Sequence, residues 1–575
     1  MNNRKALLLP ALALAIGIMH LAAIRLPDCF GFDALRYFSR AAAAIWALLF
    51  LALAGAIVRI PLERLPPKLD SKYLPAMIGL CWLFMLLFLR ASAPLLGDGL
   101  ARVQGIRAAY LSELKSQPAI LDAVIHFLLF QFLQGLPRAD FLTYTLLSYL
   151  AGLFYLSMVF IAGRRFFSDP REKVFWLLIM LGPGYIQLFA GYAENYSFLP
   201  GLVLLWMIGI KEAERGKVWP LIASQMLLIS FHLFFLLTLP ATLYLLVMRP
   251  EKRIRFAAMC LTLLGAGAGA VSLVLVWKYF RGLDIFLRPD RFFAPAHFRD
   301  LFNNQMAASP AFPLLFAGLF LAREKAKPSR PEIALLLAVL IVAVFFFFLR
   351  PAIGAARDWD LFCFPAMLYT PALALYLLPR LKDAPNLAAR FGAFIFLVSA
   401  FHTGAWLSVN HYEPKMIRRI EFHLDENRGR ERWASAYGYM VLGKYYVLTD
   451  RLDPAMNAFD KSIKIDPSYS QFRLLYGYQL WRVGKYEDAI AQMEKARAIN
   501  PTSPGIRKFL SHFYLEYARI LMAAGRNLEA ETCLQKLFEL DPAWRPGLET
   551  LADFYRNYLK DPGKARYYEG LLNQK

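Results

Sequence analysis

Long apolar stretches fill most of the first 410 residues and constrain the fold more than any other feature. A transmembrane helix needs about 20 mostly apolar residues to cross the hydrocarbon core of a bilayer. Thirteen stretches approach that length in a chain that is 58% hydrophobic. They lie at 6–24, 41–60, 74–92, 141–162, 174–190, 196–210, 218–231, 233–248, 257–279, 311–322, 332–349, 361–378 and 391–409. The sequence therefore predicts an all-α, polytopic membrane domain of about 13 spans.

The net charge of +22 is unevenly distributed. Residues 410–575 contribute +5, and the remaining +17 belongs to the apolar part, where basic residues cluster in short loops between the predicted spans. Such a pattern orients helices in a membrane and is not typical of a surface that binds a phosphate backbone. We therefore expect no nucleic-acid partner.

The segment 119–136, "AILDAVIHFLLFQFLQGL", decides the predicted topology. If it lies along the membrane surface, the loops on one side of the membrane hold 24 Lys and Arg in roughly 66 residues. The loops on the other side hold only 15, although they are longer in total. If it crosses, this asymmetry is lost. We expect the N-terminus to be cytoplasmic in a bacterial inner membrane, with an endoplasmic reticulum membrane as the alternative. The loops 93–140 and 280–310 and everything after about 410 then lie outside.

The last 165 residues have a different character and a regular period. Pro467 and Pro501 close two units of 34 residues, and Pro542 closes a third after an insertion of seven. Small and aromatic residues recur in register, as in a tetratricopeptide repeat. We expect an α-solenoid over 411–575 that binds a protein or peptide in its groove, with Arg473, Gln479 and Arg482 exposed there. The predicted repeats lie near 436–469, 470–503 and 511–544, with a degenerate fourth at 546–575.

Asp98, in "PLLGDGLARVQG", follows the third span. It either caps a short helix that begins at Leu100 or acts as a base near the membrane surface, where partial desolvation makes a carboxylate more basic. Arg102 and Arg107 follow on the same predicted helix. Both are candidates to bind an anionic substrate.

Two further stretches contain polar residues at span boundaries. Glu194 and Asn195 lie in "GYAENYSFLP", and ionisable groups at membrane depth usually face a cavity. The alternative is a solvated residue in an interfacial belt. His232 interrupts an apolar run, where a hydrogen-bonded packing role competes with substrate binding.

The stretch "AARDWDLFCFP" places charged residues around a tryptophan just before a span. Arg357 is a candidate phosphate ligand, since a guanidinium binds phosphate through two N–H groups. Asp358 and Asp360 are candidate substrate ligands, and Trp359 is a candidate to stack on a sugar or prenyl chain. The alternative is an aromatic belt with an Arg–Asp pair.

Together these features resemble the GT-C glycosyltransferases. The resemblance rests on "GDGLARVQGIRAAY", the interfacial segment 119–136 and "RDWDLFCFPAMLYTPALAL". It implies a domain over 74–410, preceded by two extra spans in 1–73, that transfers sugar from a polyprenyl-phosphate donor with inversion. It further implies that Asp98 is catalytic and that Arg357 binds the lipid phosphate. Many members have Asp-Glu where this chain has Asp98-Gly99, so a divalent metal remains possible but no metal ligand or other cofactor is predicted.

Two other functions remain open at this stage. One is an O-antigen-ligase-like transferase, which would also use a lipid-linked donor outside the membrane. The other is a non-enzymatic membrane anchor that presents the repeats to envelope proteins. Neutralising Asp98 and Arg357 distinguishes an anchor, which tolerates the change, from an enzyme.

Overall fold

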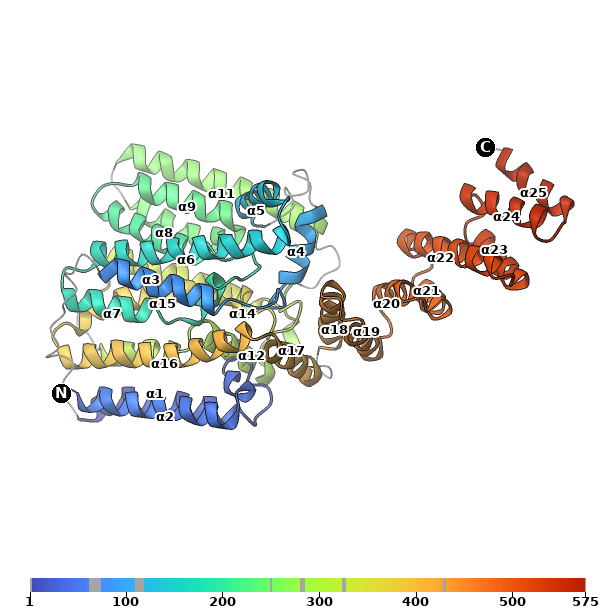
Figure 1. The fold of residues 1–575 in the computed structure, drawn as a ribbon. Coiled ribbons are helices and arrows are strands. Elements are labelled where there is room, and N and C mark those ends of the chain that lie inside the picture. The colour runs from blue at the N-terminus through green and yellow to red at the C-terminus, as the bar shows by residue number, and fades with distance from the viewer. Residues whose placement is uncertain are drawn as a thin grey trace. The chain divides into compact units, whose positions relative to one another are not determined.

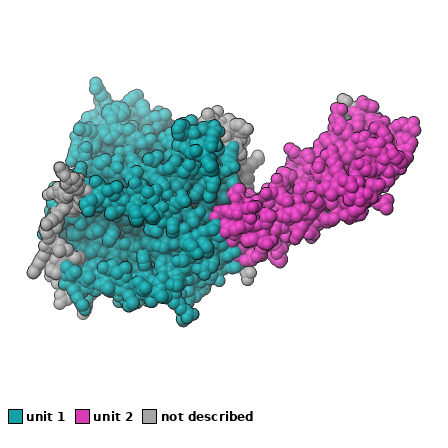
Figure 2. Space-filling view, in the orientation of Figure 1, with its two compact units in different colours: residues 1–426 teal, residues 427–575 magenta. Residues whose placement is uncertain are grey.

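The computed structural model describes residues 3–60, 74–108, 118–248, 251–279, 285–322, 327–427 and 431–573. Parts of the predicted loops, at 61–73, 109–117 and 280–284, lie outside these ranges. Within them the backbone is helical, and the β-type pairing is confined to one bridge between Phe286 and Leu349. The chain forms two compact units, residues 1–426 and 427–575 (Figure 2). The predicted all-α fold class is confirmed.

The first unit is a bundle of apolar helices, most of which run alongside one another (Figure 1). Its α-helices are α1 (Asn3–Ala22), α2 (Arg40–Arg59), α3 (Leu74–Phe88), α4 (Gly99–Ala108), α5 (Ile120–Leu133), α6 (Ala139–Phe166), α7 (Pro170–Met180), α8 (Leu199–Glu214), α9 (Trp219–Phe231), α10 (Leu239–Val247), α11 (Lys252–Tyr279), α12 (Pro295–Ala308), α13 (Phe312–Leu321), α14 (Arg330–Phe348), α15 (Phe364–Leu381), α16 (Pro385–His411) and α17 (Glu413–Asn427). Short 3₁₀ helices are η1 (Ala34–Tyr37), η4 (Gly184–Phe189), η5 (Leu233–Thr238), η6 (Pro289–Arg291) and η7 (Leu361–Cys363).

Among the described residues, five helical segments are long and apolar enough to cross a membrane, and several shorter apolar helices accompany them. The five are Arg40–Arg59, Ala139–Phe166, Arg330–Phe348, Leu361–Leu381 and Pro385–His411. Large apolar side chains face outward on these helices, such as Ile45 and Leu48 on α2, each 65% exposed. Apolar side chains so exposed are stable in lipid and costly in water. The chain is a membrane protein.

Local sequence signals set several helix starts in this unit. The Ser39 hydroxyl accepts a hydrogen bond from the N–H of Ala42 at the start of α2, and the Asp169 carboxylate accepts one from Arg171 at the start of α7. Ser329 and Glu332 form a capping box at the start of α14. Each satisfies backbone donors that the first helical turn leaves unpaired.

Helix α5, within the ambiguous segment 119–136, differs in direction from the rest of the bundle. Figure 1 shows it nearly end-on, while α6, α8 and α9 run across the view. With 14 residues it is about 21 Å long, shorter than the hydrocarbon core. Asp122 and His126 are buried, whereas Leu128 and Phe132 are exposed on the surface. This amphipathic arrangement agrees with a helix lying along a membrane surface.

The second unit consists of four helical hairpins. They are α18 (Arg432–Leu448) with α19 (Leu452–Ile465), α20 (Ser470–Arg482) with α21 (Tyr486–Ile499), α22 (Pro504–Ala523) with α23 (Asn527–Leu540), and α24 (Arg545–Asn557) with α25 (Pro562–Asn573). Each hairpin turn contains one residue with positive φ, namely Asp450, Gly484, Gly525 and Lys560. Gly484 and Gly525, in the second and third turns, lie 41 positions apart, whereas the repeat period is 34. Since α22 has 20 residues against 13 in α20, the seven inserted residues lengthen the first helix of the third repeat.

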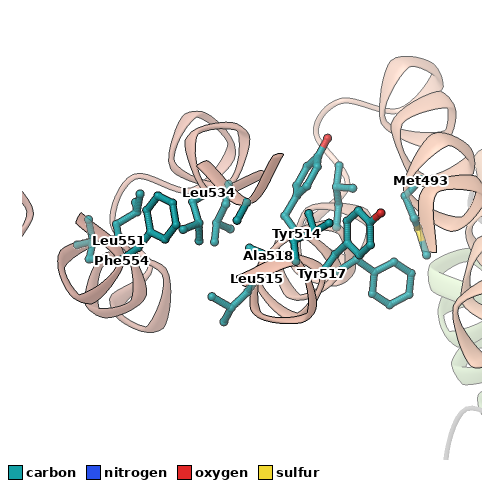
Figure 3. Close-up of a cluster of buried hydrophobic side chains, with 14 of the residues drawn as sticks. Met493, Tyr514, Leu515, Tyr517, Ala518, Leu534, Leu551 and Phe554 are labelled. Atoms are coloured by element: carbon teal, nitrogen blue, oxygen red, sulfur yellow. The ribbon is translucent and has the colours of Figure 1, made fainter. Parts of the chain in front are cut away.

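Neighbouring hairpins share one apolar core. Met493 of α21, Ala518 of α22, Leu534 of α23 and Phe554 of α24 are almost fully buried, and Figure 3 shows them in successive layers. No hairpin buries these faces alone, which is the physical basis of a repeat solenoid. One expected groove residue is placed differently, because Gln479 is only 8% exposed.

Candidate functional site

Gly97 brings three distant parts of the chain to one point beside Asp98. It lies in the loop between α3 and α4 with φ +57°, in the left-handed region that favours glycine. A Cβ at this position would lie 2.5 Å from Oδ2 of Asp360, 2.9 Å from the hydroxyl of Tyr192 and 3.1 Å from Oε1 of Glu194. Only glycine fits here without moving these side chains. The "GDG" motif therefore forms a close contact between the loop and a buried polar cluster.

Glu194 holds the backbone of the Asp98 loop. It comes from the loop that leads into α8, is 2% exposed, and its Oε1 accepts a 2.7 Å hydrogen bond from the N–H of Asp98. The other oxygen lies 3.4 Å from Nε of Arg102 and accepts the N–H of Asn195 at 3.3 Å. Burial raises the pKa of Glu194 against the opposing effect of the Arg102 charge. The glutamate fixes the position of Asp98 through its main chain.

Asp360 flanks Gly97 on its other side. Its Oδ2 accepts a 3.0 Å hydrogen bond from the Tyr192 hydroxyl, and its Oδ1 accepts the N–H of Leu361 at 2.9 Å as the cap of η7. Burial, and then repulsion from Asp358, raise the pKa of Asp360 above its ordinary value. The buried carboxyl groups of Glu194 and Asp360 therefore border the loop that carries the half-buried Asp98.

The Asp98 carboxylate itself forms no hydrogen bond or ion pair with any residue that the structure describes. Its main-chain oxygen accepts the N–H of Arg102, so Asp98 occupies the cap position of α4. A capping side chain would accept the N–H of Leu100 or Ala101, and no such bond is present in this described segment. The half-buried carboxylate is consequently available to a substrate.

Arg357 contacts the Gly97 loop from the segment between α14 and η7, 260 residues further along the chain. Its Nη2 donates a 3.1 Å hydrogen bond to the carbonyl oxygen of Gly97, and the side chain is 8% exposed. The two residues that the sequence singled out, Asp98 and Arg357, are therefore neighbours in space. The positive charge of the guanidinium lies next to the loop that presents the carboxylate.

The residues beside Arg357 support its loop. Oδ2 of Asp358 accepts the N–H of Ile353 at 2.9 Å. Trp359 is 1% exposed, and its ring packs edge-on against Tyr192 and Trp406, with centroids 5.6 and 4.4 Å apart. The stacking role expected for Trp359 is therefore not available in this structure, because the indole belongs to the protein core. Aromatic residues at a span boundary serve packing as readily as ligand contact.

A second layer of polar residues lies behind Glu194. The Asn195 amide, turned so that its nitrogen faces Asp122, lies 3.2 Å from Oδ2 of Asp122 and 3.2 Å from Nη1 of Arg102. Nδ1 of His126 lies 3.0 Å from the same Asp122 oxygen. Asp122 and His126 were not singled out as site residues from the sequence. Their spacing of four residues on one helical face was the available signal.

Two predicted residues have their hydrogen-bond partners outside this cluster. Arg107, further along α4, donates from Nε to Oδ2 of Asp140 at 2.7 Å and is largely exposed. His232 is buried, its Nδ1 accepts the N–H of Phe234 at 3.2 Å, and its ring packs on Tyr196. These contacts agree with the hydrogen-bonded packing role that the sequence left as an alternative, and substrate binding by His232 stays a prediction.

Among the described residues, no group of three or more His, Cys, Asp or Glu side chains is arranged to hold a metal ion. Asp98, Glu194 and Asp360 surround Gly97 without converging on one point. The sequence left a divalent metal open, and this part of the chain contains no ready set of ligands for one.

Models of the tetratricopeptide repeat family match residues 436–469 and 480–551. The chain is thus an all-α, polytopic membrane protein with C-terminal tetratricopeptide repeats, as its sequence predicted. No curated protein sequence matches it.

Several solved structures are similar. ArnT from Cupriavidus metallidurans bound to undecaprenyl phosphate matches at 16% identity and a TM-score of 0.37, over 73% of this chain and 79% of that chain. Apo ArnT matches at 17% identity and a TM-score of 0.33, over 79% and 80%. A MamA structure matches at 15% identity and a TM-score of 0.21, over 28% and 81%. ArnT is a GT-C glycosyltransferase, the superfamily that the sequence resembles.

Proposed function

We propose that this protein is a membrane glycosyltransferase that moves a sugar from a polyprenyl-phosphate donor to an acceptor outside the cytoplasm. The acceptor is a protein or an envelope glycan. The observation that carries the proposal is the juxtaposition of an available carboxylate, Asp98, with a buried guanidinium, Arg357, which binds the loop that carries Asp98. A base and a phosphate ligand are the two groups that this transfer requires.

In the proposed reaction, Asp98 removes the proton from an acceptor hydroxyl. The acceptor oxygen forms a bond to the anomeric carbon as the bond from that carbon to the phosphate oxygen breaks. The electron pair leaves with the polyprenyl phosphate, the proton stays on Asp98, and the anomeric configuration is inverted. Arg357 neutralises the charge that develops on the leaving phosphate, which would be costly near hydrocarbon without a partner.

The buried neighbours position these two groups. Glu194 binds the N–H of Asp98 and pairs with Arg102, so the loop that carries the base has few alternative conformations. A base held close to its reactive geometry contributes more to the rate than the same base on a mobile loop. Arg102, 24% exposed, is a second candidate for a donor or acceptor contact.

The orientation in the membrane is part of the proposal. We infer a cytoplasmic N-terminus, thirteen spans, α5 along the outer surface, and periplasmic repeats that bind a protein or peptide. The division of 24 against 15 basic loop residues supports this arrangement. Asp98 then faces the compartment where sugars on polyprenyl phosphate are used.

Glycan analysis of a deletion strain tests the function. Mass spectrometry of envelope glycans and glycoproteins from the deletion strain should show the loss of one sugar residue and accumulation of its lipid-linked donor. Restoration by the wild-type chain assigns the loss to this protein. Unchanged glycans and donor levels would leave the membrane-anchor function as the better account.

A further inference from the structure

A groove lies between α9 and α11, away from the cluster around Gly97. Its volume is about 610 Å³. The lining residues on α9 are Trp219, Ile222 and Met226; those on α11 include Lys252, Arg253, Phe256, Ala257 and Leu264. Apart from the two cations, the groove is lined by apolar and aromatic side chains.

The groove opens at the opposite end of the bundle from Asp98. Helix α8 begins just after the Glu194 loop and runs away from it for 16 residues, about 24 Å. The chain then turns and α9 begins at Trp219. Helix α11 also begins at this end, because the segment formed by η5 and α10 returns the chain to it. In the proposed topology this end faces the cytoplasm.

The polar end of the groove is positively charged. Lys252 and Arg253 occupy the first turn of α11, both are exposed, and neither forms an ion pair with a described residue. The free N–H groups of that turn add partial positive charge. Trp219, 70% exposed at the first residue of α9, lies beside them. Tryptophan and basic side chains at a helix end mark the level of lipid headgroups.

The remaining length of the groove is apolar and open to the bilayer. Phe256 and Leu264 are 62% and 59% exposed along α11. From Arg253 to Leu264 the helix rises about 16 Å, roughly the depth of one acyl chain in a leaflet. An apolar channel that ends in two cations complements a molecule with an anionic head and a long hydrocarbon tail.

We propose that this groove binds an anionic glycerophospholipid of the cytoplasmic leaflet. The headgroup phosphate contacts Lys252 and Arg253, Trp219 borders the headgroup, and one acyl chain lies along Phe256 and Ala257. Basic pockets between membrane helices on the cytoplasmic side bind anionic headgroups in this way. The bound lipid would anchor α11 against α9.

Native mass spectrometry of the full-length protein in detergent tests the proposal. The probes are phosphatidylglycerol and phosphatidylcholine with the same acyl chains. Two cations near a headgroup favour the anionic lipid by about tenfold or more. The double variant Lys252→Gln/Arg253→Gln should lose this preference. The control Arg171→Gln/Lys173→Gln, which removes two cations at the same end but outside the groove, should keep it.

A second variant separates the groove from general charge effects. Ala257→Trp fills the apolar channel without changing any charge, and it should reduce retention of phosphatidylglycerol at least fivefold, with an unchanged melting temperature as the test of folding. Equal binding of the two lipids, or equal loss in the control variant, would overturn the proposal. Binding of undecaprenyl phosphate that is lost in Lys252→Gln/Arg253→Gln but kept in the control variant would assign the groove to a polyprenyl phosphate instead. Sugar transfer by these variants is expected to persist, so this test is independent of the proposed activity.

Discussion

The main-chain N–H of Asp98 donates a 2.7 Å hydrogen bond to Oε1 of Glu194, 96 residues further along the chain. This bond uses the buried glutamate to hold a loop and leaves the aspartate carboxylate available. Arg357 binds the same loop at the carbonyl oxygen of Gly97. Glu194 and Arg357 therefore bind the N–H and the C=O of the same peptide group, the one that joins Gly97 to Asp98.

Replacing Arg357 should weaken donor binding. Arg357→Gln keeps a hydrogen-bond donor for the Gly97 carbonyl but removes the charge, and a charge-assisted hydrogen bond contributes about 1.5–3 kcal/mol. We expect binding of undecaprenyl phosphate, measured by native mass spectrometry, to fall by about ten- to a hundredfold. Arg288→Gln, an exposed arginine on the outer loop, is the matched control and should bind as the wild type does. Wild-type binding by Arg357→Gln would remove this residue from the donor site.

The stability of the membrane unit should depend on pH through Asp360, which lies just outside a membrane-spanning segment. Burial, followed by the charge of Asp358, raises its pKa. The protonated form is favoured on folding, so this contribution is present below about pH 4 and is lost as the pH rises through the raised pKa. We expect the wild-type melting temperature to fall between pH 5 and pH 8, and Asp360→Asn to reduce that fall.

The control for this prediction is Asp290→Asn, because Asp290 is 61% exposed. It should follow the wild-type pH profile. If the melting temperature of Asp360→Asn falls with pH as steeply as that of the wild type, Asp360 does not titrate as its burial requires.

The repeat unit should be sensitive to added volume at Gly443. A Cβ there would lie 2.9 Å from two ring carbons of Phe459, closer than packed atoms approach. Expressed alone, residues 427–575 should be helical, and Gly443→Ala should lower their free energy of unfolding by about 1–3 kcal/mol in urea titrations followed by circular dichroism. Gly570 lies in α25, and a Cβ there would have no neighbour within 4 Å. Gly570→Ala should therefore be neutral or stabilising by up to about 1 kcal/mol. Equal effects of the two substitutions would contradict the packing described here.

Reporter fusions should establish the orientation. Because α5 is proposed not to cross the membrane, alkaline phosphatase fused after residue 118 and after residue 138 should be active in both cases, and also after residue 412. Green fluorescent protein should be dark at all three sites and fluorescent after residue 215. Opposite reporter activities at 118 and 138 would make α5 a span and would reverse the inferred sides of every later loop.

The sequence predicted the architecture of the chain better than it predicted contacts between individual residues. Apolar length and proline spacing report local structure, so the bundle and the repeat period were both predictable. The spacing also showed the seven-residue insertion near Pro542, but only the structure places it in α22. The hydrogen bond between Asp98 and Glu194 depends on how the loops before α4 and α8 meet, which no local pattern records.

The same distinction applies to the candidate site, where some residues could be identified from the sequence and others only from their packing. Asp98, Glu194 and Arg357 were singled out because each is a charged residue at a span boundary with a chemistry of its own, a criterion that does not depend on packing. Trp359 met a weaker criterion, since aromatic residues at span boundaries line cores and ligand sites alike. Asp122 and His126 were passed over because their partner, Asn195, comes from a different loop.

The most direct test of the account is Asp98→Asn in the deletion strain. The amide is nearly the same size as the carboxylate and retains the main-chain bond to Glu194, so folding and membrane level should match the wild type. Without the base, we expect sugar transfer to fall by about 10²–10⁴-fold, so that the mass-spectrometric glycan profile remains that of the deletion strain. Asp290→Asn should restore the wild-type profile. Full restoration by Asp98→Asn would contradict the proposal that this carboxylate is the catalytic base.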